Sequence, residues 1–76
     1  MEQREKDGLF GVTFTADEYT VVRQWAQDRA EQGEITATPA RLYLPVYSSM
    51  TTVEEGDTIW FDPESTSPNP FKVDRA

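Results

Sequence analysis

The chemistry open to this chain of 76 residues rests on carboxylates, because it has 14 Asp and Glu residues but no Cys and no His. Three carboxylates, those of Glu54, Glu55 and Asp57, fall within four residues. Carboxylate oxygens are the ligands that calcium prefers. The segment nevertheless lacks the alternating oxygen donors of a calcium-binding loop. We therefore interpret it as a solvated turn between strands and expect no metal ion and no other cofactor.

Catalytic groups are hard to assemble from the remaining residues. Two opposed carboxylates could hydrolyse a glycoside, but no spacing singles out one pair. Ser48 and Ser49 lack a neighbouring His or Lys that would activate a serine nucleophile. Gly8 and Gly11 do not continue into a phosphate-binding loop. A domain this small also has little room for a water-excluding pocket. We expect no enzymatic activity and no catalytic residues.

The charge balance limits the kinds of partner. Seven Lys and Arg residues against 14 acids give a net charge of -7. Because binding to nucleic-acid phosphates depends on counterions released by Lys and Arg, we expect no direct nucleic-acid binding. A protein with a basic surface fits the charge better, and the chain is expected to act as a monomer or a homodimer. The acidity could also reflect solvation at high salt rather than recognition.

Membrane insertion is not expected from the sequence. No stretch approaches the roughly 20 apolar residues of a membrane span, and the first residues lack the layout of a signal peptide. These features favour a cytoplasmic location, which would be the host cytoplasm if a phage encodes the protein.

The elements that position these side chains begin with a strand and a helix. Phe10, Val12 and Phe14 alternate as in a half-buried strand over residues 8–15. Gly11 lies on the opposite face and indicates a bulge or a close approach. Thr15 and Glu18 then form a capping box, and Val22 and Trp25 follow at helical spacing, which predicts a helix from Ala16 to about Gln32.

Strand-forming residues dominate the rest of the chain. Short strands are predicted at residues 34–38 and 41–47, and the state of residues 48–53 is left open between a turn and a strand. Pro45 indicates an edge strand or a strand end. After the turn at residues 54–57, a strand at 58–61 precedes a Pro-rich loop at 62–70. Phe71 and Val73 either return as a docking strand or belong to a disordered end.

The pattern predicts an α+β fold in which one amphipathic helix packs on a small antiparallel sheet of three to five strands. Residues 1–7 are expected to be a flexible lead-in, residues 8–62 a single domain, and residues 63–76 a Pro/Ser-rich segment that could dock as a short strand.

Three aromatic residues are the predicted centre of a partner-binding surface. If the alternating apolar residues face the core, Tyr43, Tyr47 and Trp60 share the opposite face of the sheet. These apolar residues are Leu42, Leu44, Val46, Ile59 and Phe61. Tyr and Trp are enriched at interface hot spots. Carboxylates at Glu54, Glu55 and Asp57 would complement a basic partner. The alternative is a reversed register, or a C-terminal segment that covers these aromatics.

A small acidic binding module is the function that these features favour. We expect an inhibitor or adaptor of the phage or mobile-element type, which binds a host nucleic-acid-handling protein such as a CRISPR, restriction or polymerase component partly by acidic mimicry. The first alternative is a small virion-type structural subunit that homo-oligomerises through an edge strand at residues 41–47, although Pro45 would limit that pairing.

The second alternative comes from a family resemblance. Residues Ala40–Pro45 and Gly56–Phe61 resemble the Arg-x-x-Leu/Ile-Pro and Gly-Asp-x-Val-x-Phe motifs of swapped-hairpin regulators of the AbrB and MazE type. The resemblance covers about 22 residues and implies a DNA-binding regulator or antitoxin. Val46 to Glu55 lacks the basic residues that the DNA-binding helix of that family would need.

Overall fold

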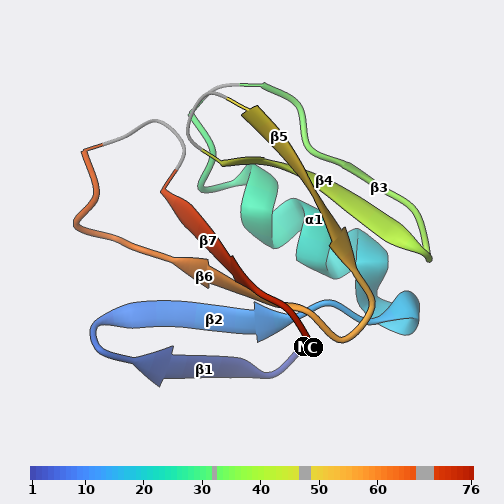
Figure 1. The fold of residues 1–76 in the computed structure, drawn as a ribbon, viewed down its shortest axis with the longest axis horizontal. Coiled ribbons are helices and arrows are strands. Elements are labelled where there is room, and N and C mark those ends of the chain that lie inside the picture. The colour runs from blue at the N-terminus through green and yellow to red at the C-terminus, as the bar shows by residue number, and fades with distance from the viewer. Residues whose placement is uncertain (32, 47–48, 67–69) are drawn as a thin grey trace.

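Two antiparallel sheets and one helix make up the structure, a computed structural model that describes residues 1–31, 33–46, 49–66 and 70–76 (Figure 1). Sheet A has the strand order β1-β2-β6-β7, and sheet B has the order β3-β4-β5. In chain order the elements are β1 (Gln3–Lys6), β2 (Leu9–Thr13), the 3-10 turn η1 (Ala16–Glu18), α1 (Tyr19–Gln27), β3 (Thr36–Ala37), β4 (Arg41–Val46), β5 (Ser49–Glu54), β6 (Thr58–Phe61) and β7 (Phe71–Asp74). The α+β class is confirmed, although the strands divide between two sheets instead of forming one.

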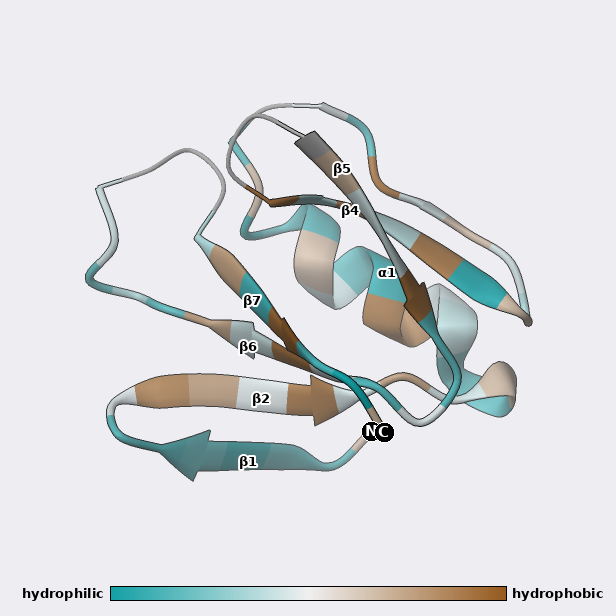
Figure 2. Cartoon of the chain, in the orientation of Figure 1, coloured by the Kyte–Doolittle hydropathy of each residue, from teal (hydrophilic) through white to brown (hydrophobic). Residues whose placement is uncertain are grey.

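Strand β1 lies where a flexible lead-in is predicted for residues 1–7. Asp7 and Gly8 form the turn that joins β1 to β2, with φ angles of 54° and 80°. Two-residue hairpin turns need positive φ at both central positions, and Asp-Gly supplies them at low cost. Gln3 to Lys6 then pair along β2. Since β1 is hydrophilic over its whole length (Figure 2), hydrophobic patterning does not reveal it.

The predicted helix is present but shorter than expected. It begins with η1 and ends at Gln27 instead of at about Gln32. The Gln27 side chain accepts a hydrogen bond of 2.7 Å from the backbone N–H of Ile35 and donates one of 3.3 Å to the carbonyl of Gly33. These contacts turn the chain back, so that Ile35 becomes fully buried beside the helix.

The start of the helix also differs from a capping box. The Thr15 hydroxyl donates to the Glu18 carboxylate at 3.3 Å, and neither side chain caps a backbone N–H. The backbone N–H of Ala16 instead donates to the Glu55 carboxylate at 3.1 Å. A residue from the β5–β6 turn therefore caps the first turn.

Sheet B follows the predicted alternation. Leu42 and Leu44 on β4 are fully buried, as expected. The segment left open as turn or strand contributes β5, which pairs along the whole of β4. β3 pairs only with Tyr43 and Leu42. β4 is thus the middle strand of sheet B, and the edge strand predicted at residues 41–47 is wrong. Pro45 is tolerated because it lies beyond the end of β3, the strand that its N–H would face.

Strands β6 and β7 complete sheet A. The predicted turn before β6 contains Gly56, whose φ is 94°. Phe71 on β7 pairs with Phe61 on β6 and is 1% exposed. Phe71 and Val73 both lie on this strand, paired with Phe61 and Ile59.

The core lies between the two sheets and α1, which contacts β3 and β4. Eleven buried apolar residues form it: Val12, Phe14, Val22, Trp25, Ala26, Ile35, Leu42, Leu44, Val53, Ile59 and Phe71. In the described part of the chain, no helix is both long enough and apolar enough to cross a membrane.

Candidate partner-binding surface

The predicted aromatic surface is divided between the two sheets. Tyr43 lies on β4 of sheet B, where it is 38% exposed between Thr36 and Thr52. Trp60 lies on β6 of sheet A. Tyr47 lies outside the described residues. Tyr43 and Trp60 therefore do not share one sheet face, and each is a separate candidate for partner binding.

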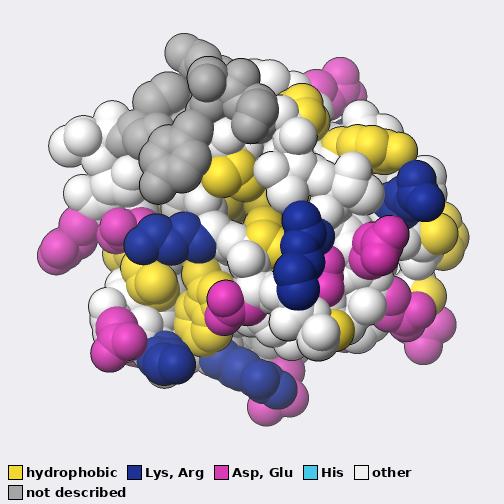
Figure 3. Space-filling view, viewed as in Figure 1, with side chains coloured by type: hydrophobic (Ala, Val, Ile, Leu, Met, Phe, Trp, Pro, Cys, Tyr) yellow, Lys and Arg dark blue, Asp and Glu magenta, His cyan; other side chains and the backbone are white. Residues whose placement is uncertain are grey.

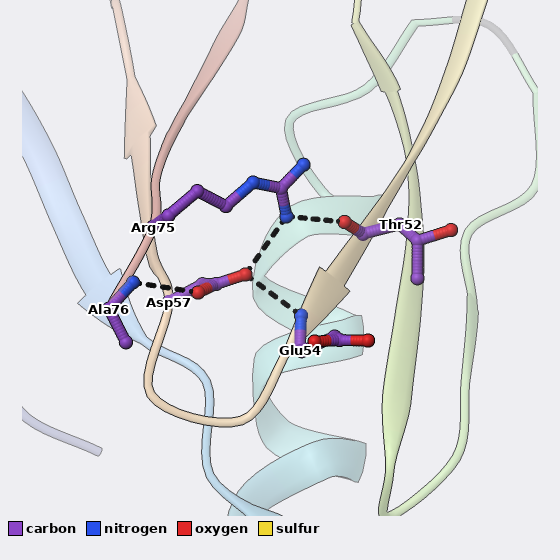
Figure 4. A network of polar contacts seen from close by, with 5 residues as sticks. All are labelled: Thr52, Glu54, Asp57, Arg75 and Ala76. Carbon is purple, nitrogen blue, oxygen red and sulfur yellow. Dashed lines mark hydrogen bonds and ion pairs between the residues drawn. The ribbon is translucent and has the colours of Figure 1, made fainter.

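The predicted acidic turn is engaged in contacts within the protein (Figure 4). Asp57 is only 4% exposed. One carboxylate oxygen accepts from Arg75 at 2.9 Å and from the backbone N–H of Glu54 at 3.0 Å, and the other accepts from the backbone N–H of Ala76 at 2.9 Å. Arg75 also donates to the carbonyl of Thr52 at 2.6 Å. The network joins the end of β7 in sheet A to β5 in sheet B.

These contacts set the charge state of Asp57. Burial acts to raise the pKa of Asp57, but hydrogen bonds from Glu54 and Ala76 and the nearby Arg75 guanidinium outweigh it and hold the pKa below its ordinary value. The carboxylate is therefore ionised at neutral pH, with its oxygens already occupied by donors.

The other two acids of the turn do not complete a metal site. The Glu55 carboxylate accepts from Ala16, and only Glu54 presents an exposed carboxylate with no described contact. Among the residues that the structure describes, no group of three acidic side chains could hold a metal ion. An open polar pocket of about 490 Å³ lies at this turn, but its central carboxylate is the engaged Asp57.

Neighbouring residues of sheet A fix the position of the Trp60 side chain. It pairs with Gly11 on β2, and on the neighbouring row Val12 pairs with buried Ile59. Trp60 and Gly11 therefore lie on the outer face of the sheet. A Cβ added to Gly11 would lie 2.7 Å from Cε3, 2.7 Å from Cζ3 and 3.0 Å from Cδ2 of the indole. Similar distances to three ring atoms place that Cβ above the ring plane, so the indole lies flat over the glycine.

A hydrogen bond fixes the rotation of this ring. The indole N–H of Trp60 donates to the carboxylate of Asp74 on β7 at 3.0 Å. Trp60 is half-buried, because one face of its ring covers Gly11. The result is an ordered aromatic ring on the surface of a rigid sheet.

Three cationic side chains share this face. Arg4, Gly11, Trp60 and Lys72 form one row across the four strands, as the register of sheet A shows. Lys6 lies two residues from Arg4 along β1 and so points to the same side. In Figure 3, Lys and Arg side chains over β1 and β7 lie on either side of hydrophobic ones. We call Arg4, Lys6, Gly11, Trp60 and Lys72 the Trp60 face.

Most other cations in the chain make contacts within the protein, whereas the cations of the Trp60 face make no hydrogen bond or ion pair with the described residues. Arg75 is bound by Asp57, Arg23 donates to the carbonyl of Ile35 at 2.9 Å, and Arg29 stacks over Trp25 with its guanidinium carbon 4.5 Å from the ring centroid. With the described residues, the side chains of four exposed cations make no hydrogen bond or ion pair: Arg4, Lys6, Arg41 and Lys72. Three of these four belong to the Trp60 face.

A small pocket lies beside Trp60 on this surface. It has a volume of about 160 Å³ and is lined by Lys6, Asp7, Leu9, Trp60, Lys72 and Asp74. Its size suits one side chain of a partner rather than a whole small substrate. The arrangement offers an apolar ring with charged side chains of both signs around it.

The sequence analysis identified Trp60 but missed the cations that surround it. Arg4, Lys6 and Lys72 look scattered along the chain, and only strand pairing gathers them. The overlooked signal was Asp7-Gly8, because that dipeptide predicts a hairpin and would have placed residues 3–6 beside β2.

Comparisons with protein-family models, with curated proteins and with solved structures find no match to this chain. They add no support to the resemblance to AbrB and MazE regulators. Between the two motifs of that resemblance, the structure has strand β5 where the family pattern has a helix. The argument for function therefore rests on the geometry of the surface.

Proposed function

We propose that this protein is a non-catalytic protein-binding module whose partner contacts the Trp60 face. The observation that carries the proposal is the exposed half of Trp60, held flat over Gly11 and fixed by Asp74. Trp is among the residues most enriched at interface hot spots. A side chain that is already ordered loses little conformational entropy when a partner binds. An inhibitor or adaptor role is compatible with a domain of this kind.

This proposal moves the binding surface away from the predicted one. Asp57 is buried and engaged, and Tyr43 lies on the other sheet. Tyr43 remains exposed, so it provides a matched aromatic control at a different place on the surface. The predicted acidic mimicry through the turn at residues 54–57 is not part of the proposal.

The test is affinity capture with matched variants. Wild type, Trp60→Ala and Tyr43→Ala are used as baits in a nuclease-treated native lysate, and the captured proteins are identified by mass spectrometry and tested again in purified form. We expect one protein that binds wild type and Tyr43→Ala but is lost with Trp60→Ala. Equal capture by folded Trp60→Ala would show that the partner binds elsewhere.

A structural subunit is the second candidate, favoured by the edge strand of sheet B. β5 has no neighbour on its outer side among the described strands, and Met50 on it is 56% exposed. Unpaired edges can join two copies of a chain. Sedimentation velocity of wild type and Met50→Lys tests this role: a dimer that dissociates on substitution would support it, and a wild-type monomer at high concentration would exclude self-assembly through β5.

A further inference from the structure

We infer that the Trp60 face binds an acidic segment of its protein partner, an inference that rests on the proposed function and specifies the chemistry of the ligand. The net charge of the whole chain, -7, favours a basic partner, whereas the local charges on this face favour an acidic one. The sign of the charge on the bound segment depends on which charges of this protein lie within contact distance of it.

Three cations lie around Trp60, against the two acids, Asp7 and Asp74, that line its pocket. Arg4 and Lys72 flank Gly11 and Trp60 in the same row of sheet A, and Lys6 lines the pocket beside the ring. All three are exposed and make no ion pair with described residues. Charges that are not neutralised internally can form charge-assisted hydrogen bonds with partner carboxylates.

The Trp60 ring favours an apolar or planar side chain on the partner. One face of Trp60 covers Gly11, which leaves the other face for a side chain of the partner. Aromatic pairs and apolar contacts at such a ring add to the charge interactions. The expected segment therefore carries an aromatic or large apolar side chain between acidic residues.

Nucleic acid fits this face less well than an acidic peptide. Asp7 and Asp74 line the same pocket as Lys6 and Lys72, so negative charges interrupt the positive ones. A peptide can space its carboxylates to avoid them, whereas a nucleic-acid backbone carries a phosphate at every nucleotide. The net charge of -7 also opposes the approach of a long polyanion.

The experiment uses three probes of similar length with ¹⁵N-labelled protein. One is a synthetic peptide of glutamate and aspartate around a single phenylalanine, the second replaces its acids by the corresponding amides, and the third is a thymidine oligonucleotide. The indole N–H signal of Trp60 reports binding at the ring. Arg4→Gln and Lys72→Gln test the cations, and Arg41→Gln is the control because Arg41 is an exposed cation on sheet B.

The expected result is that the acidic peptide shifts the Trp60 signal and the amide peptide binds more weakly. Arg4→Gln and Lys72→Gln should each weaken binding about two- to fivefold, the range for exposed ion pairs, while Arg41→Gln has no effect. Equal binding of the amide peptide, tighter binding of the oligonucleotide, or no binding of the acidic peptide would each overturn the inference.

The same signal separates this inference from the proposed function. If the acidic peptide fails but the purified partner from the capture experiment shifts the Trp60 signal, the face binds a protein of different chemistry and only the inference is lost. If that partner also leaves the Trp60 signal unchanged, the proposed function fails as well.

Discussion

The indole of Trp60 lies flat over Gly11, its direct partner across the β2–β6 pairing. A side chain at position 11 would occupy the space that the ring now fills. Gly11 has no positive φ that would require glycine for backbone reasons. The glycine is therefore explained by the tryptophan above it, and the pair can be tested as a unit.

Gly11→Ala should destabilise the protein by about 1–3 kcal/mol, although alanine usually stabilises a strand relative to glycine. The added Cβ would approach two ring atoms to 2.7 Å, so the indole must move and its bond to Asp74 must weaken. Urea unfolding measures the loss, and the indole N–H signal reports the movement of the ring.

The control for this prediction is the double variant Gly11→Ala/Trp60→Ala. Without the indole, the added methyl group meets no ring, and Gly11→Ala should become neutral or stabilising in that background. An equal cost in both backgrounds would show that position 11 excludes alanine for a reason unrelated to Trp60.

Asp57→Asn should cost about 1.5–3 kcal/mol at neutral pH, because it removes a charge that accepts hydrogen bonds from Glu54, Ala76 and Arg75. The pKa of Asp57 in the folded protein lies below its ordinary value, so its stabilising contribution is fully present above the unfolded pKa of about 3.9. The contribution is lost as the pH falls through the lower folded pKa.

The measurement for Asp57 compares urea unfolding of wild type and Asp57→Asn across pH. The difference in unfolding free energy should stay constant above pH of about 5 and shrink below pH of about 4. An unchanged difference at low pH would contradict a role for the ionised carboxylate.

Gln27→Ala should destabilise the protein by about 1–3 kcal/mol, because it leaves the N–H of buried Ile35 without its acceptor. Gln24→Ala on the same helix is the control, since Gln24 makes only an exposed bond of 2.7 Å to Asp28. Thermal or urea unfolding should show a larger loss of stability for Gln27→Ala than for Gln24→Ala. Similar losses would mean that the Gln27 contacts do not hold the segment after the helix.

The two tryptophans should respond differently to truncation. Trp25 is 5% exposed and packs against Phe71 in the core, so Trp25→Ala should cost about 3–5 kcal/mol. Trp60 is only half-buried on the outer face of sheet A, and Trp60→Ala should cost about 1–2 kcal/mol while leaving the fold intact. Circular dichroism during urea unfolding measures both. Comparable losses in unfolding free energy would show that Trp60 serves mainly to stabilise the fold.

Local patterns in the sequence predicted much of the fold. Alternation at Leu42 and Leu44 identified the buried face of β4, and the helical spacing of Val22 and Trp25 identified the buried face of α1. Each of these patterns lies within one element, where side-chain direction follows from backbone geometry. Strand β1 was not predicted, because its residues are polar and exposed and such a strand shows no hydrophobic periodicity.

The candidate site could be predicted only in part. Trp60 was visible as an exposed aromatic, and Gly11 indicated a close approach. Their contact, however, depends on pairing between β2 and β6, which lie far apart in the sequence. The division into two sheets is equally non-local, which is why Tyr43 and Trp60 were placed together incorrectly. Register between distant strands is set by the whole core and not by either segment.

The cationic row on an otherwise anionic chain also has a kinetic consequence. At low salt, where the Debye length reaches about 30 Å, an approaching acidic partner first meets the net charge of -7 and is repelled, while in contact it meets Arg4 and Lys72. The cations of the Trp60 face would favour those encounters in which this face is turned toward such a partner. Encounters would then be infrequent but already oriented, and moderate salt would speed association even as it shortens the lifetime of the complex.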